Sequence, residues 1–262
     1  MRRLENKVAV VTGGAGSGIG HGISLELARE GARVAIFELD MQAADSLCAR
    51  IQSDGGCARA YRADISRGEE VRRAIDQVAA DFGRLDVLVN NAGIGMIRAA
   101  AEATEEDYDR VHSINLRGAW LCAKYAIPHM QRQGGGSIVN IASVHARATM
   151  PLYALYATMK AGIVGLTRGL AVQYGPDGIR ANAVLPGLVD GKQTREVIGQ
   201  FVPDVDRFIA DFVRRHQAVP RPISPADVGQ VVAFLAGDGA RAITGAEIPV
   251  DAGLLALLLS RD

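Results

Sequence analysis

Short apolar runs alternate along the chain with longer stretches whose apolar residues recur every three or four positions. The short runs are rich in β-branched residues and read as continuous hydrophobic segments, which is typical of strands covered on both faces. The longer stretches have the period of amphipathic helices. The pattern predicts strands at residues 8–11, 33–37, 58–62, 86–89, 137–141, 181–185 and 247–250.

Helix-start signals show where helices begin between these predicted strands. Ser66, followed by Glu69 three residues later, has the spacing of a capping box, and Ser224-Pro225 has the residues preferred at the N-cap and N1 positions. Alternating strands and helices predict an α/β fold with a doubly wound, mainly parallel sheet and helices on both faces. We expect helices at residues 18–30, 42–51 and 153–174, and others that begin at Ser66, Thr104 and Ser224.

No linker, low-complexity tract or internal repeat interrupts this alternation, so residues 1–262 are expected to form one domain. Residues 191–219 are the least sheet-like part of the chain because they mix helix-forming residues with turn residues. This segment is expected to cover a substrate site.

Composition narrows the classes of partner. The chain has 29 basic and 29 acidic residues, and this balance argues against binding to nucleic acid or to an anionic membrane. The apolar runs at 8–11 and 254–259 are too short for a signal-peptide core or a membrane span. Three cysteines without a C-x-x-C spacing indicate a reducing compartment, so the cytoplasm is expected. Five scattered histidines give no metal-site spacing, and no metal is expected.

The segment PLYALYATMK, residues 151–160, holds two tyrosines and one lysine. Residues four apart on a helix lie ~6 Å apart on one face, and this is the spacing of Tyr156 and Lys160. Tyr153 lies ~10 Å from Lys160 along the helix axis. Spacing therefore favours Tyr156 as the partner of Lys160 in an acid–base pair, although a tyrosine and a lysine on a helix can also be ordinary residues.

A glycine-rich turn, VVTGGAGSGIGHGI, follows the first predicted strand and opens the first helix. In that position glycines let the backbone approach a pyrophosphate at a helix N-terminus, although many such turns are only tight turns. Glu38 directly follows the second predicted strand, 18 residues after Gly20. This is close to the spacing at which an acidic residue receives the adenosine ribose, and the alternative is a solvated carboxylate.

With these motifs the chain resembles the short-chain dehydrogenase/reductase family over nearly its whole length. The family motif T-G-x-x-x-G-x-G corresponds to Thr12 to Gly20 with one extra residue. Either Gly14 takes the place of the first glycine or the turn bulges. The resemblance implies a Rossmann-type fold, and it implies that Tyr156, as the tyrosine of Y-x-x-x-K, is the proton donor.

The resemblance implies three further catalytic residues. Lys160 lowers the pKa of Tyr156 and grips the nicotinamide ribose, and Ser143, 13 residues before Tyr156, donates a hydrogen bond to the substrate oxygen. Asn115, in VHSINLRGAW, holds a water that connects Lys160 to solvent. Each residue has an ordinary structural alternative, but their joint order and spacing favour the catalytic set.

The resemblance also implies the cofactor contacts. Asp64 is expected to meet the adenine and Val189 the nicotinamide amide, whereas the position where the family often has a threonine for that amide is Gly191 here. The expected contacts are Gly14, Ser17, Gly18, Ile19, Glu38, Asp64, Ile65, Asn91, Ala92, Gly93, Tyr156, Lys160, Pro186, Gly187 and Val189.

We therefore expect an NAD-dependent oxidoreductase that interconverts a secondary alcohol and its ketone, with a polyol, a sugar or a cyclic alcohol as substrate. Ser143, His145 and Tyr156 are the expected substrate contacts. NAD is expected because Glu38 is followed by Leu39 and no cation offsets its charge against a 2′-phosphate. One alternative is a 3-oxoacyl-thioester reductase, which shares the motifs but usually prefers NADP. The other is a non-enzymatic dinucleotide sensor or scaffold, which would be expected to lack Tyr156 or Lys160.

The apolar tail LLALLL, residues 254–259, is poorly suited to water on a monomer. The family commonly buries this end between subunits. A homotetramer is therefore expected.

Overall fold

The computed structural model describes residues 2–260, and its centre is a single parallel sheet with the strand order β3-β2-β1-β4-β5-β6-β7. Each predicted strand is present, and its ends lie within two residues of the prediction. The strands are Val8–Thr12 (β1), Arg33–Glu38 (β2), Cys57–Arg62 (β3), Val87–Asn90 (β4), Gly136–Ile141 (β5), Ile179–Pro186 (β6) and Glu247–Val250 (β7).

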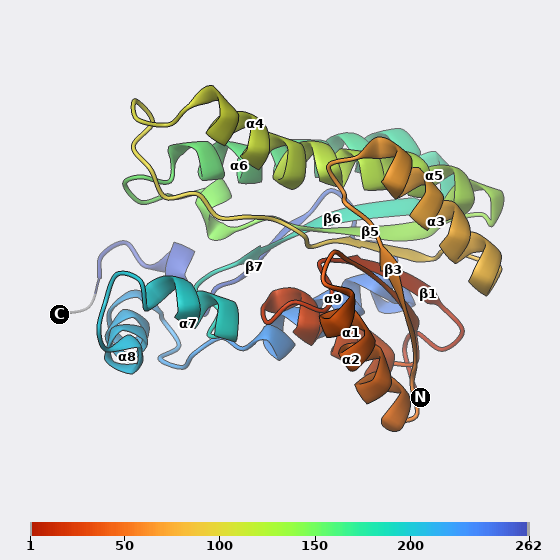
Figure 1. The fold of residues 1–262 in the computed structure, drawn as a ribbon, viewed down its shortest axis with the longest axis horizontal. Coiled ribbons are helices and arrows are strands. Elements are labelled where there is room, and N and C mark those ends of the chain that lie inside the picture. Colours follow the sequence, from red (N-terminus) through yellow and green to blue (C-terminus); the bar gives the residue numbers. More distant parts are fainter. Residues whose placement is uncertain (1, 261–262) are drawn as a thin grey trace.

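Helices cover both faces of the sheet, as the sequence predicted (Figure 1). One face carries Ile19–Arg29 (α1), Met41–Ser53 (α2) and Pro225–Ala236 (α9). The other carries Gly68–Phe82 (α3), Glu105–His112 (α4), Gly118–Arg132 (α5) and Ala154–Tyr174 (α6). Two shorter helices, Lys192–Ile198 (α7) and Val205–His216 (α8), lie in the segment that was expected to cover a substrate site.

The sheet separates two apolar cores, because successive side chains of a strand point to opposite faces. In β1, Ala9 and Val11 pack with α1, α2 and α9, whereas Val8 and Val10 pack with α3, α5 and α6. All four side chains are fully buried. This double burial explains why the strand shows as a continuous apolar run in the sequence.

Helices α1 and α9 approach closely because each carries a glycine at the contact. A Cβ atom on Gly22 would lie 2.5 Å from the Pro225 carbonyl, and one on Gly229 would lie 2.7 Å from the Gly22 oxygen. The predicted start of α9 is confirmed, with Ser224 and Asp227 forming a reciprocal capping box. Helix α1, which leaves the glycine-rich turn, is thereby held against the rest of the core.

The predicted capping box of Ser66 and Glu69 is wrong. Helix α3 begins at Gly68 after Arg67, which makes no side-chain cap. Ser66 instead donates its backbone N–H (2.9 Å) and its hydroxyl (2.7 Å) to Asp64 Oδ1. The Ser66 N–H, which a capping box would give to Glu69, is therefore bound to Asp64 instead.

The long helix that was predicted from Thr104 starts with a capping box between Thr104 and Asp107. It is not one continuous α-helix, because Ser113–Arg117 form a π-helical turn (η1) between α4 and α5. This turn carries Asn115. No helix in residues 2–260 has both the length and the apolar character that crossing a membrane requires.

Candidate active site

The predicted site residues gather at the carboxyl ends of the parallel strands. The strand order reverses between β1 and β4, and ligands of open α/β sheets bind in the crevice at such a point. A cleft of about 460 Å³ opens there. Its lining includes residues 17–19 of the glycine-rich turn, Glu38, residues 64–65 and residues 91–93, all of which were predicted to bind a cofactor.

Hydrogen bonds from Thr12 and Asn91 tie the loop after β1 to the loop after β4. The hydroxyl oxygen of Thr12 accepts the backbone N–H groups of Asn91 and Ala92, each at 3.0 Å. The Asn91 side-chain amide donates to the carbonyls of Thr12 and Gly13, also at 3.0 Å. The floor of the cleft is therefore held by side chains, and the sequence did not predict the role of Thr12.

The longer glycine-rich turn places its glycines in different roles. Gly13 has φ +60° and lines the cleft. Gly14 faces α1, where its carbonyl accepts the Ser24 hydroxyl at 2.9 Å, and it is absent from the cleft lining. At Gly18 a Cβ would lie 2.6 Å from Gln193 Oε1 of α7, so a side chain there would displace the end of the Gln193 side chain.

Glu38 lies at the wall of the cleft where β2 ends. Its carboxylate accepts the backbone N–H groups of Leu39 at 2.9 Å and Ala15 at 3.4 Å. Among the described residues that line the cleft, Glu38, Asp64 and Glu196 are acidic and none is basic. The described lining of the cleft therefore brings acidic side chains, and no basic one, to this wall.

Ser143, Tyr156 and Lys160 meet where β5 ends beside α6. The Tyr156 hydroxyl interacts with the Ser143 hydroxyl. Lys160 Nζ lies 5.6 Å from the centre of the Tyr156 ring and donates to the Ile141 carbonyl at 2.9 Å. Tyr153 instead precedes the first turn of α6, and its ring centre lies 6.1 Å from that of Tyr156.

Burial shifts the pKa values of the lysine and the tyrosine in opposite directions. Lys160 is only 5% exposed, and desolvation of its ammonium group lowers its pKa to about 8. Burial raises the pKa of Tyr156 to about 12, and the nearby Ser143 hydroxyl offsets only part of that effect. The predicted lowering of the Tyr156 pKa by Lys160 is therefore not found in the structure, where desolvation sets the direction of the shift.

Asn115 and Gly93 converge on the same place from the other side. The Asn115 side chain accepts the Ile94 N–H at 2.8 Å and donates to the Ile94 carbonyl at 2.9 Å. A Cβ on Gly93 would lie 3.2 Å from Asn115 Oδ1 and 3.6 Å from Lys160 Nζ. The amide thus positions the loop after β4, a role that the sequence did not reveal.

The remaining predicted cofactor contacts lie beyond the lining of this cleft, at the end of β6. Pro186 is the last residue of that strand, the N–H of Gly187 donates to the Val250 carbonyl at 3.0 Å, and Val189 forms a β-bridge with Ile223. Gln193 and Glu196 of α7, which the sequence did not single out, do line the cleft. The only sequence signal for them was their place in residues 191–219.

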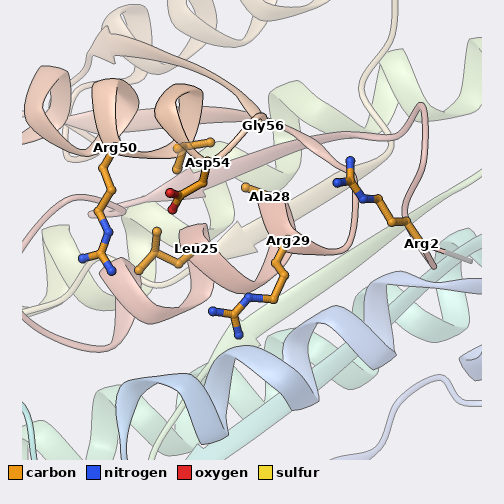
Figure 2. A pocket seen from close by; sticks show the side chains of 8 residues that line it. Arg2, Leu25, Ala28, Arg29, Arg50, Asp54 and Gly56 are labelled. Atoms are coloured by element: carbon orange, nitrogen blue, oxygen red, sulfur yellow. The ribbon is translucent and has the colours of Figure 1, made fainter.

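A second hollow, of about 280 Å³, lies between α1 and α2 (Figure 2). Arg2, Arg29 and Arg50 line it together with Asp54, whose carboxylate offsets part of their charge. Arg29 also pairs with Glu26 at 2.8 Å. No predicted site residue borders this hollow, so it is separate from the cleft.

Comparisons with known proteins agree with this architecture. A family model described as enoyl-(acyl carrier protein) reductase matches residues 14–255. A probable galactose dehydrogenase of Rhizobium meliloti is 38% identical over 252 residues, which cover 96% of both chains. A D-threitol dehydrogenase of Mycolicibacterium smegmatis is 36% identical over 251 residues, or 96% of this chain and 94% of that one. The solved structure of a putative short-chain dehydrogenase/reductase from Burkholderia xenovorans is 34% identical, with a TM-score of 0.93, and covers 98% of this chain and 99% of that chain.

The chain therefore belongs to the short-chain dehydrogenase/reductase family and is an oxidoreductase of that family. The family membership that the sequence motifs predicted is confirmed.

Tyr156→Phe is expected to lower turnover by roughly 100-fold or more, because a general acid–base group contributes at least that much and the phenyl ring still packs. Cofactor binding, followed by fluorescence titration, should survive. Tyr153→Phe is the matched control and should keep most of the activity. An inactive Tyr153 variant beside an active Tyr156 variant would show that the acid–base residue has been assigned wrongly.

The buried Lys160 predicts a pH-dependent stability. The unfolded chain keeps this proton up to the ordinary lysine pKa of 10.5, whereas the folded protein releases it above about 8. In that window the unfolded state binds more protons, so stability rises with pH. Relative to Lys160→Met, the free energy of unfolding of the wild type should rise by up to ~1.4 kcal/mol per pH unit. Urea unfolding at several pH values measures this difference, and a flat or falling difference would contradict the assignment.

Proposed function

We propose that the protein interconverts a secondary alcohol and its ketone, with NAD as the hydride carrier and a polyol, sugar or cyclic alcohol as the substrate. The observation that carries the proposal is the meeting of the Ser143 and Tyr156 hydroxyls with the amine of Lys160 beside the cleft. The names of the relatives that act on galactose and D-threitol support a substrate with several hydroxyls.

A nicotinamide dinucleotide supplies the hydride acceptor or donor when it is bound. In alcohol oxidation, Tyr156 takes the hydroxyl proton of the substrate as the carbinol carbon loses its hydride. Ser143 donates a hydrogen bond to the substrate oxygen and stabilises the charge that develops on it. The reverse sequence reduces the ketone.

In this proposal, Lys160 and Asn115 carry the proton between Tyr156 and solvent. A protonated Lys160 favours the phenolate form of Tyr156, and its pKa of about 8 brings its own charge change close to neutral pH. Asn115 holds the water that leads from Lys160 to solvent. Its hydrogen bonds to Ile94 hold the Asn115 side chain against the loop after β4.

The place of the cleft, over the glycine-rich turn and the N-terminus of α1, supports binding of the dinucleotide. We assign Ser17, Gly18 and Ile19 to the pyrophosphate, Glu38 to the adenosine ribose and Asp64 with Ile65 to the adenine. We assign residues 91–93 to the middle of the cofactor. Pro186, Gly187 and Val189, with Tyr156 and Lys160, take its nicotinamide end.

Residues 191–219 are assigned as the cover of the site. Helix α7 already lies against the glycine-rich turn through Gln193. Its Arg195 pairs with Asp190 at 2.6 Å and with Asp206 at 2.7 Å, and these ion pairs link α7 to the segment after β6 and to α8.

The second candidate function is reduction of an acyl thioester, and the description of the matching family model favours it. The acidic lining of the cleft opposes it, because such reductases usually prefer NADP. A panel of secondary alcohols, ketones and a 3-oxoacyl thioester, each followed by the absorbance of the reduced cofactor, separates the two candidates. Turnover of the thioester alone would replace the first proposal by the second.

Glu38 is expected to impose a preference for NAD over NADP of at least about tenfold in kcat/KM, or ~1.4 kcal/mol. The reason is that a 2′-phosphate would lie against a carboxylate with no basic residue in the described lining. Glu38→Ser should weaken the use of NAD and relax the preference, whereas Glu196→Gln, on the α7 side of the cleft, tests whether any lost carboxylate has this effect. Equal efficiency of the wild type with both cofactors would refute the role of Glu38.

A homotetramer in the cytoplasm is the form in which we expect the protein to act. Leu258 is 94% exposed and Leu259 is 79% exposed in the single chain, so association would remove apolar surface from water. Light scattering at micromolar protein should give about four times the 27.7 kDa of one chain. Replacing Leu258 and Leu259 with serine should weaken the assembly, and a monomeric mass for the wild type would refute it.

A further inference from the structure

A group of three rings lies beside the proposed reacting centre. His145 comes two residues after Ser143, and its backbone N–H donates to the Ser143 hydroxyl oxygen at 3.2 Å. Its imidazole stacks on Tyr153, with 4.5 Å between ring centres, and meets Tyr156 edge-on at 5.6 Å. The three-ring cluster of His145, Tyr153 and Tyr156 therefore includes the proposed acid–base residue.

The orientation of the His145 ring is restrained from two directions. Thr149 Oγ1 lies 2.8 Å from Nδ1, and the stack on Tyr153 restrains the plane of the ring. Burial lowers the pKa of His145 and so favours the neutral form of the imidazole. Within residues 2–260, Nε2 has no hydrogen-bond partner.

The Tyr153 hydroxyl is also without a hydrogen-bond partner in the part of the chain that the structure describes. Burial raises its pKa, so it stays protonated and can donate or accept. Two uncharged polar groups, His145 Nε2 and the Tyr153 hydroxyl, thus belong to the same half-buried cluster as Tyr156. The ring centres of His145 and Tyr153 lie 5.6 Å and 6.1 Å from that of Tyr156.

We propose that His145, oriented by Thr149 and stacked on Tyr153, determines substrate specificity by hydrogen-bonding a second hydroxyl on the carbon next to the reacting carbinol. The enzyme would then select vicinal diols, including polyols and sugars, over simple secondary alcohols. The inference rests on the proposed function, because Ser143 and Tyr156 mark the reacting carbon.

The chemistry of a neutral imidazole favours a hydroxyl as its partner. Each nitrogen of the ring donates a hydrogen bond in one tautomer and accepts one in the other. A hydroxyl can pair with either tautomer, because it both donates and accepts. A carboxylate would lose hydration beside the aromatic rings and gain no opposite charge. A methyl group would leave the nitrogen unpaired. The cluster therefore suits a neutral, polyhydroxylated alcohol better than a hydroxy acid.

Three substrates of similar size test the idea: butan-2-ol, butane-2,3-diol with its stereoisomers assayed one by one, and 3-hydroxybutyrate. For the wild type, kcat/KM for the best diol should exceed that for butan-2-ol by about tenfold or more, since one hydrogen bond to a buried group is worth that factor. His145→Phe keeps the ring contacts but removes the nitrogens. It should lower the ratio of diol to butan-2-ol by about tenfold.

Two further variants control for folding and for general effects. His145→Gln keeps a donor and an acceptor and should retain more of the diol preference than His145→Phe. His129→Phe removes a histidine that pairs with Asp76 at 2.8 Å outside the cleft, and it should leave the ratio unchanged. Cofactor binding by fluorescence shows whether each variant is folded.

The outcomes separate the inference from the proposed function. Oxidation of butan-2-ol with no preference for any diol, an equal ratio in His145→Phe, or a preference for 3-hydroxybutyrate would overturn the inference and leave the proposed function standing. Failure of the wild type to oxidise any alcohol or reduce any ketone, with either dinucleotide, would overturn both.

Discussion

The buried amine of Lys160 is the group on which the rest of the site depends. An ammonium removed from water is unfavourable unless it is compensated, and here the compensation comes from one hydrogen bond to the Ile141 carbonyl and from the face of the Tyr156 ring. Ile141 is the last residue of β5, and Ser143 follows two residues later. The strand end that holds the amine therefore also delivers the Ser143 hydroxyl to Tyr156, so the packing of α6 against β5 places all three groups.

The cofactor side of the site is built by the same edge of the sheet. The loops after β1 and β4 are joined by Thr12 and Asn91, and the loop after β4 is joined to η1 by Asn115. The loop after β5 brings His145 against Tyr153 and Tyr156. The proposed catalytic groups, cofactor cleft and substrate contacts thus share one set of strand ends, with α7 packed over the glycine-rich turn.

Much of this could be predicted from the sequence, for identifiable physical reasons. Strands buried on both faces leave apolar runs, and a helix has a fixed period, so the strand order along the chain and the Tyr156–Lys160 spacing could be read directly. The contact of Gln193 with Gly18 could not be predicted from the sequence, because it joins segments that are far apart along the chain. The π-helical turn at Asn115 has no local sequence signature. The Ser66 hydroxyl donates to the Asp64 carboxylate and does not cap the next helix. The pKa of Tyr156 depends on its burial, which sequence spacing does not report.

The central claim is that this site moves a hydride between a carbinol carbon and a nicotinamide cofactor while Tyr156 moves the proton. The most direct test follows the atom itself. The alcohol that the wild type oxidises fastest is prepared with deuterium on the carbinol carbon, and the reduced cofactor is analysed by mass spectrometry. The account predicts one deuterium in each molecule of reduced cofactor and an equal amount of ketone. Reduced cofactor without deuterium, or ketone formed without reduced cofactor, would contradict it.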